Sequence, residues 1–309
     1  GGSNTAIGRS ALENNTTASH NTAVGRNTLL ANTTGVSLVA VGSNALNANT
    51  TANYNNAFGH AALLTNTTGG NNVAVGHAAL MANTTASNNT GIGFNALLAN
   101  TTGAQNVAVG AYALDDNTTG GNNIGIGYNS LSANTDASNN IGIGFNSLVF
   151  NTTGDTNVAI GSNALRENTT ADNNTAVGNS ALYANTTGTL NTAIGTNALT
   201  SATTASNNTA VGATALGANT TGTENVVIGA YAADAGTNIS NTVAVGYNAL
   251  TNTTNNHNTA CGSKALEDTT SGSSNVAVGS LSGTDNTTGG NNTASGFAAL
   301  RYNTTGSNN

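Results

Sequence analysis

The stretch from Asn71 to Gly103 reads NNVAVGHAALMANTTASNNTGIGFNALLANTTG and states one phrase twice. The glycine that closes each AVG or GIG recurs 18 times in 309 residues, at steps of 17 residues with one step of 16. A short, fixed period over the full length indicates a solenoid or fibre. These marker glycines are Gly8, Gly25, Gly42, Gly59, Gly76, Gly93, Gly110, Gly127, Gly144, Gly161, Gly178, Gly195, Gly212, Gly229, Gly246, Gly262, Gly279 and Gly296.

The three residues before each marker alternate between β-branched and small side chains, as in Val73-Ala74-Val75. This period of two predicts a short strand. We expect the β-branched pair to face the core, and the small residue to face a surface that something approaches closely. The predicted core therefore includes Val75, Ile92 and Val109.

Leucine stands four residues after the marker in 16 of the 18 repeats, and Ala233 and Gly283 are the exceptions. We interpret this segment as a second short strand whose leucine points inward, with the glycine allowing a tight corner. The leucines of the quoted stretch and the next repeat complete the predicted core: Leu80, Leu97 and Leu114.

Asparagine follows three residues after that leucine position in 14 repeats and opens a turn-like Asn-Thr-Thr-Gly segment. Stacked coils would align these side chains, so that their amides bond from coil to coil. Asn83, Asn100 and Asn117 represent this predicted turn ladder.

Together these patterns predict an all-β fold, a parallel β-roll or β-solenoid of about 18 coils with a 17-residue period. A helical fold is excluded because every repeat contains glycine and charged i,i+4 pairs are missing. We expect one repeat domain over residues 1–309. Neither end carries an atypical capping unit, so we expect a fragment of a longer chain, uncapped at both ends.

The amino-acid composition excludes several classes of binding partner. Charged residues make up 6% of the chain, Pro and Trp are absent, and only five residues are basic, with a net charge of −7. A nucleic-acid partner is therefore not expected, and no apolar run is long enough for membrane insertion. The thin core and low charge favour self-association. Cys261 stands where other repeats have Val or Ile and is interpreted as a small core residue.

We predict no catalytic residues, no cofactor-binding residues and no metal site, and hence no enzyme. No histidine–acid pair recurs beside a nucleophile, and His60 and His77 form a pair without a third ligand. The best surface candidate is an aromatic stripe flanked by asparagines, which could stack on sugars. Contacts between subunits or ordinary stacking between coils are the favoured explanations. The stripe consists of Phe94, Tyr112, Tyr128 and Phe145.

The motifs NTAVG, NVAVG and NIGIG, each followed by a variable pair and AL, resemble two related groups of proteins. One is the left-handed parallel β-roll head of YadA-like trimeric autotransporter adhesins, whose period is shorter. The other is the NTAIG/AL/NTTG repeat of bacteriophage tail-fibre and related bacterial surface fibre proteins. The resemblance implies a left-handed homotrimer located outside the cell, on a virion tail or a bacterial surface.

The sequence thus favours a structural protein, the shaft or head of an extracellular adhesive fibre that attaches to a host-cell surface or a glycan receptor. The alternative is a monomeric ice- or carbohydrate-binding β-solenoid. Its strongest support is the recurrence of threonine pairs such as Thr84-Thr85 and Thr101-Thr102.

Overall fold

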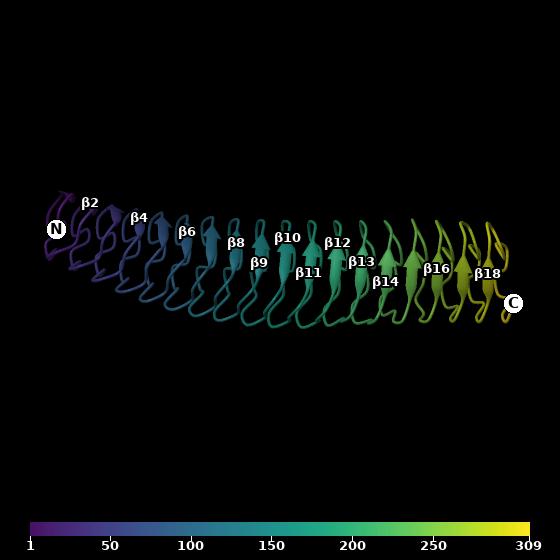
Figure 1. The fold of residues 1–309 in the computed structure, drawn as a ribbon. Coiled ribbons are helices and arrows are strands. Elements are labelled where there is room, and N and C mark those ends of the chain that lie inside the picture. Colours follow the sequence, from purple (N-terminus) through teal and green to yellow (C-terminus); the bar gives the residue numbers. More distant parts are fainter. The chain divides into compact units, whose positions relative to one another are not determined.

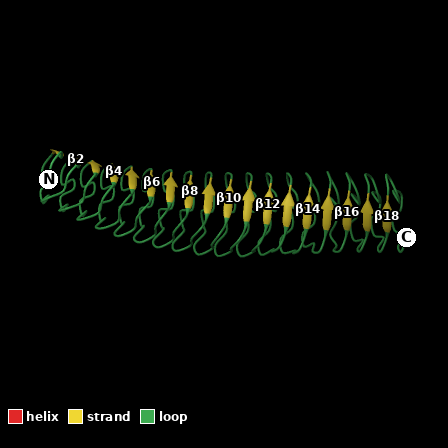
Figure 2. Cartoon of the chain, in the orientation of Figure 1, coloured by secondary structure: helices red, strands yellow, loops and turns green.

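The computed structural model describes residues 1–309 and is an all-β solenoid with a 17-residue period. Each coil contributes one three-residue strand, and turns and loops make up the rest (Figures 1 and 2). The strands are β1 (Thr5–Ile7), β2 (Thr22–Val24), β3 (Val39–Val41), β4 (Asn56–Phe58), β5 (Val73–Val75), β6 (Thr90–Ile92), β7 (Val107–Val109), β8 (Ile124–Ile126), β9 (Ile141–Ile143), β10 (Val158–Ile160), β11 (Thr175–Val177), β12 (Thr192–Ile194), β13 (Thr209–Val211), β14 (Val226–Ile228), β15 (Val243–Val245), β16 (Thr259–Cys261), β17 (Val276–Val278) and β18 (Thr293–Ser295).

The chain forms two compact units, Gly1–Thr156 with β1 to β9 and Asn157–Asn309 with β10 to β18. Within each unit, consecutive strands pair in parallel, and equivalent residues of neighbouring coils face each other. The single 16-residue step falls between β15 and β16 and leaves this register intact. The chain contains no helix that is long and apolar enough to cross a membrane.

The interior of each coil is made by the middle residue of the strand and the leucine that follows the marker. Leu80, Leu97 and Leu114 are fully buried, as predicted, and so is Ala74 in β5. A Cβ atom added to Gly91, the middle residue of β6, would lie 3.3 Å from Leu80 Cγ. The leucine side chain therefore leaves little room on the strand, which explains why the middle residue is alanine or glycine in every strand except β14, where Val227 is buried.

The β-branched pair points outward, contrary to the prediction. Val75 is 37% and Ile92 is 38% exposed, and Val109 is partly exposed. The predicted core positions Val75, Ile92 and Val109 are therefore wrong, because an alternating pattern does not reveal which of its two faces is buried. Cys261, the third residue of β16, is likewise exposed and not in the core. We call the first and third residues of all strands the outer face.

The predicted second strand does not form. Its segment is a run of turns in which two residues have positive φ, 55° at Ala78 and 53° at Leu80 in the repeat that follows β5. The backbone still bonds from coil to coil: Ala78 N–H donates to His60 O and Leu80 N–H donates to Ala96 O, both at 2.9 Å. These left-handed residues bend the chain, which an extended strand would not do.

Candidate functional surfaces

The predicted turn ladder is present and buried. Asn83 Nδ2 donates to Asn66 Oδ1 at 2.8 Å, and Asn100 repeats this bond to Asn83 at 2.9 Å. Asn117 bonds to Asn100 in the same way at 2.8 Å, and these side chains are fully buried. Each amide also donates to a carbonyl of its own coil, such as Ala86 O for Asn83. The buried amides are thus paired in two directions, as burial of a polar group requires.

A second buried asparagine ladder was not predicted. It lies immediately before the strands, where Asn72 Oδ1 accepts the backbone N–H of Asn89 at 2.9 Å. Asn72 Nδ2 donates to Ala86 O at 2.9 Å, the same carbonyl that Asn83 bonds. Both ladders therefore hold one corner of the coil. The recurrence of asparagine directly before the strand in most repeats is the signal that would have revealed it.

The threonine pairs divide between interior and surface. Thr84 Oγ1 donates to Thr101 O at 3.1 Å, and Thr101 Oγ1 donates to Thr118 O at 3.0 Å. Only the second threonine of each pair, Thr85 or Thr102, is exposed. Each pair therefore presents one exposed threonine to solvent, while the hydroxyl of the other bonds to the neighbouring coil.

The turn ladder is interrupted where the sequence departs from asparagine. Ala202 and Gly236 occupy ladder positions in the second unit. The preceding ladder oxygens, Asn185 Oδ1 and Asn219 Oδ1, are buried without a hydrogen-bond partner. These two orphaned acceptors are therefore consequences of missing donors, and they do not by themselves form a binding site.

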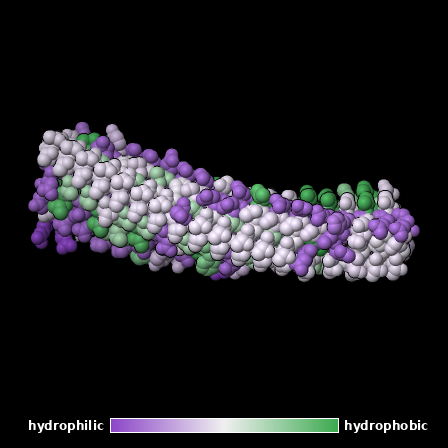
Figure 3. Space-filling view, turned by 90° about the horizontal axis from the view of Figure 1, so that it is seen from below, coloured by the Kyte–Doolittle hydropathy of each residue, from purple (hydrophilic) through white to green (hydrophobic).

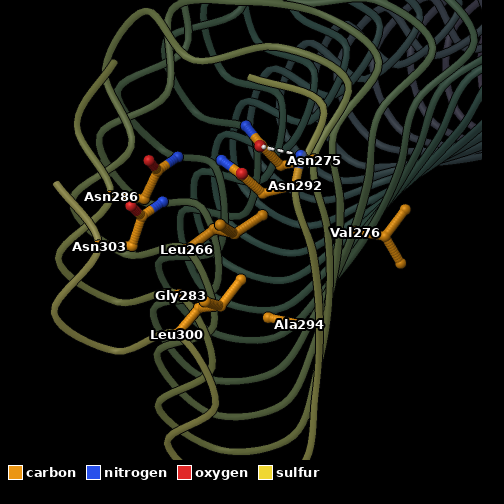
Figure 4. A pocket seen from close by; sticks show the side chains of 9 residues that line it. All are labelled: Leu266, Asn275, Val276, Gly283, Asn286, Asn292, Ala294, Leu300 and Asn303. Atoms are coloured by element: carbon orange, nitrogen blue, oxygen red, sulfur yellow. Dashed lines mark hydrogen bonds between the residues drawn. The ribbon is translucent and has the colours of Figure 1, made fainter. Parts of the chain in front are cut away.

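A small cavity marks the coil in which Gly283 replaces the leucine (Figure 4). In this view, Leu266 and Leu300 lie on either side of Gly283, and Ala294 faces it. Asparagine side chains line the opposite end of the cavity: Asn275, Asn286, Asn292 and Asn303. The lining contains no titratable group, so the cavity is best explained as the volume of one absent leucine side chain.

The predicted aromatic stripe forms part of a longer series of contacting rings. Phe94 and Tyr112 meet edge to face at 5.3 Å between centroids, Tyr112 and Tyr128 do so at 5.9 Å, and Tyr128 stacks on Phe145 at 5.8 Å. His77 stacks on Phe94 at 5.2 Å. His60 extends the series by stacking on His77. We call His60, His77, Phe94, Tyr112, Tyr128 and Phe145 the ring ladder.

The two histidines are thus members of an aromatic series. Their ring planes are inclined by only 15°, with centroids 5.2 Å apart. No group of three or more His, Cys, Asp or Glu residues is placed to hold a metal ion. Both histidines are exposed.

The outer face is an apolar surface that recurs along both units. It is built mainly from Val, Ile and Thr and includes no charged residue. Ile160, Ile194 and Ile228 are about as exposed as Val75. Over the second unit, hydrophobic side chains project along one edge of the view in Figure 3, while most of the visible surface is of intermediate hydropathy. An uncharged apolar surface of this regularity is typical of an interaction site.

Among the carboxylates, Asp115 has an unusual environment. It is half-buried, and Ser132 Oγ donates a hydrogen bond to its Oδ1 at 2.7 Å. Burial raises the pKa of Asp115, the Ser132 hydrogen bond opposes this rise, and the neighbouring Asp116 carboxylate adds to it.

No known protein family and no curated protein matches this sequence. The candidate surfaces are therefore interpreted from their own geometry.

Proposed function

We propose that this chain is a structural element of an extracellular adhesive fibre, either a phage tail fibre or a bacterial surface adhesin. In this proposal three copies associate as left-handed rolls, and attachment to a host-cell surface or a glycan receptor is spread over many coils. The observation that carries the proposal is the outer face, which repeats the same uncharged, β-branched pattern in coil after coil.

Two features of the interior support a mechanical role. The asparagine ladders and the threonine hydroxyls tie each coil to the next through buried or half-buried hydrogen bonds. Such repeated bonds resist bending and separation of coils. The core of each coil contains few large apolar side chains, so a single chain buries little apolar surface. Covering the outer face with another copy would bury more.

The proposed contact surface differs from the one that the sequence suggested. The small strand residues were expected to face a partner, but Leu80 and its equivalents cover them from inside. The β-branched residues on the opposite side of the strand take over this role. Val and Ile on a pleated sheet pack well against a second sheet face.

Cys261 provides a direct test, because it is the only cysteine and lies on the outer face. We expect its thiol to react slowly with a bulky maleimide in the native protein. A variant with Ile194→Lys and Ile228→Lys places charges on the same face and should expose the thiol, with labelling roughly tenfold faster or more.

The matched control carries Thr187→Lys and Thr204→Lys, two exposed positions outside the outer face. It should label as slowly as the unmodified protein. Labelling of the unmodified protein at the rate of the unfolded chain would contradict the proposal. It would instead favour a monomeric ice- or carbohydrate-binding solenoid, which assays of thermal hysteresis and glycan binding would then distinguish.

A further inference from the structure

The ring ladder is a surface feature that the fold does not require. Its members stand one or two residues after six consecutive marker glycines, from Gly59 to Gly144. Before and after this run, the position directly after the marker holds Ser43 and Ser162, and the coils stack in the same way. The rings are therefore additions to the repeat and not conditions for its folding.

The ladder is also open to solvent. Phe94 is 44%, Tyr128 48% and Phe145 51% exposed, and Tyr112 is half-buried. An outer-face residue stands two places before five of the six rings, as Ile92 does for Phe94, and Val109 stands three places before Tyr112. An apolar surface thus continues from the strands onto the rings in this part of the first unit.

Neutral hydrogen-bonding groups border the rings. Asn95, Asn129 and Asn146 each follow a ring position, and all three are half-buried. The Oδ1 atom of Asn146, next to Phe145, is itself buried and has no hydrogen-bond partner, so a ligand would have to use the Nδ2 group of this side chain. Apart from the histidine rings themselves, no residue at the two positions after these six markers is ionisable except the tyrosines.

We propose that the ring ladder binds a neutral, extended glycan whose chain runs along the stacking direction of the first unit. The C–H faces of pyranose rings would pack on the aromatic side chains. Their hydroxyls would bond to the asparagine amides, the tyrosine hydroxyls and the imidazoles. This inference rests on the proposed role in attachment and names the chemistry of the ligand.

A second copy of the chain fits this surface less well. A contact between copies in register would use features that recur in every coil, as the outer face does, whereas an unbroken series of rings is confined to six coils. The mixture of exposed rings and neutral amides instead matches a ligand that alternates between apolar faces and hydroxyl edges.

The test is a titration with two soluble probes, cellohexaose and chitohexaose, followed by tyrosine fluorescence and by saturation-transfer NMR on the aromatic protons. The variant carries Phe94→Ser, Tyr128→Ser and Phe145→Ser, and serine is the residue that Ser43 and Ser162 provide at the same position. We expect saturable binding of at least one probe by the unmodified protein. Loss of three rings should weaken this binding roughly tenfold or more.

The control is Tyr247→Ser, which removes an exposed ring at the equivalent position in the second unit, where it contacts only Tyr231 among the aromatic residues. Binding should be unchanged in this variant. The proposal is overturned if neither probe binds or if the triple variant binds as well as the unmodified protein. It is also overturned if the triple variant loses its native mass, because the rings would then be subunit contacts. Failure of glycan binding alone would leave Cys261 protection intact and so would not affect the proposed assembly.

Discussion

At the scale of one residue, the marker glycine decides whether two coils can stack. Gly93 has a φ of 140°, and a Cβ added to it would collide with the carbonyl oxygen of Gly110 in the next coil. Only glycine therefore adopts this backbone conformation without strain and fits in the space between the two coils. The same two conditions hold at nearly every marker, which explains why this residue never varies along the chain.

We therefore predict that Gly93→Ala lowers the free energy of unfolding by roughly 3 kcal/mol or more, through strain and separation of the coils. Gly91→Ala, two residues earlier, is the matched control. Its added methyl group would lie 3.2 Å from Ala96 O and 3.3 Å from Leu80 Cγ, and alanine already stands at this position in most strands. Urea denaturation should show a large loss for the first variant and a change within about 1 kcal/mol for the second. Equal effects would contradict this role of the marker.

The raised pKa of Asp115 gives a second prediction. Because burial raises the pKa in the folded state, the folded protein binds this proton more tightly than the unfolded chain does. The associated stability is complete below the ordinary pKa of 3.8 and is lost as the pH rises through the folded pKa. Asp115→Asn should therefore raise the thermal midpoint at pH 7, and the gain should shrink as the pH falls toward 3.8.

Glu13→Gln is the control for this measurement, because Glu13 occupies the same place in its own repeat and is exposed. Thermal unfolding followed by circular dichroism between pH 3 and pH 8 would compare the two variants. A gain for Asp115→Asn that does not depend on pH would show that the charge of Asp115 is not its cause.

The residue scale also shows where prediction from sequence stops. Leu80, Leu97 and Leu114 were correctly placed in the core, because a large side chain that recurs in nearly every coil needs burial. Val75, Ile92 and Val109 were placed on the wrong side. A strand of three residues offers two faces. The leucine leaves so little space inside the coil that the middle strand residue is alanine or glycine in every strand except β14, which has Val227.

At the scale of the element, the asparagine ladder acts as a continuous bonded series. In the second unit Ala202 interrupts it, so that Asn185 Oδ1 lacks a donor and Asn219 Nδ2 bonds only Gly222 O. We predict that Ala202→Asn stabilises the protein by about 1–3 kcal/mol by restoring bonds on both sides. Asn100→Ala, within the uninterrupted ladder, should have the opposite effect of similar size. An unchanged or lower unfolding midpoint for Ala202→Asn would contradict this account.

The cavity beside Gly283 allows a related prediction. Leu266 and Leu300 hold the equivalent positions with φ values of 52° and 48°, and Gly283 has a φ of 59°. Gly283→Leu should fill the cavity and, after the cost of a left-handed conformation, stabilise the protein by roughly 1–2 kcal/mol. Gly283→Ala introduces the strain of a non-glycine residue at positive φ but does not fill the cavity, so it should be neutral or destabilising. Calorimetry that ranks alanine above leucine would refute the missing-leucine explanation.

The structural elements that could be predicted from the sequence are those whose residues recur at a fixed spacing. The strand, the 17-residue coil and the turn ladder of Asn83, Asn100 and Asn117 all followed from recurrence alone. The second strand was wrong because Leu80 adopts a positive φ, which is unfavourable for leucine in general and is imposed here by the stacking of coils. The ladder through Asn72 and Asn89 was missed, although asparagine recurs directly before the strand in most repeats and indicates it.

At the scale of the whole molecule, the outer face and the ring ladder differ in how they are distributed along the chain and in the role that each supports. The outer face recurs with every strand and supports association of copies, whereas the ring ladder is confined to six coils and supports recognition of a glycan. The sequence indicated the rings correctly as a surface stripe but did not join His60 and His77 to them. Contact between residues 17 positions apart becomes evident only once the coils are stacked.

If copies of this chain associate through the outer face, the native mass of the protein in solution will show it. Sedimentation equilibrium over a range of concentrations should give the mass of three chains of 30.1 kDa each. The variant with Ile194→Lys and Ile228→Lys should shift this mass toward that of one chain. A single-chain mass for the unmodified protein at every concentration would contradict the account and would leave the outer face free for another partner.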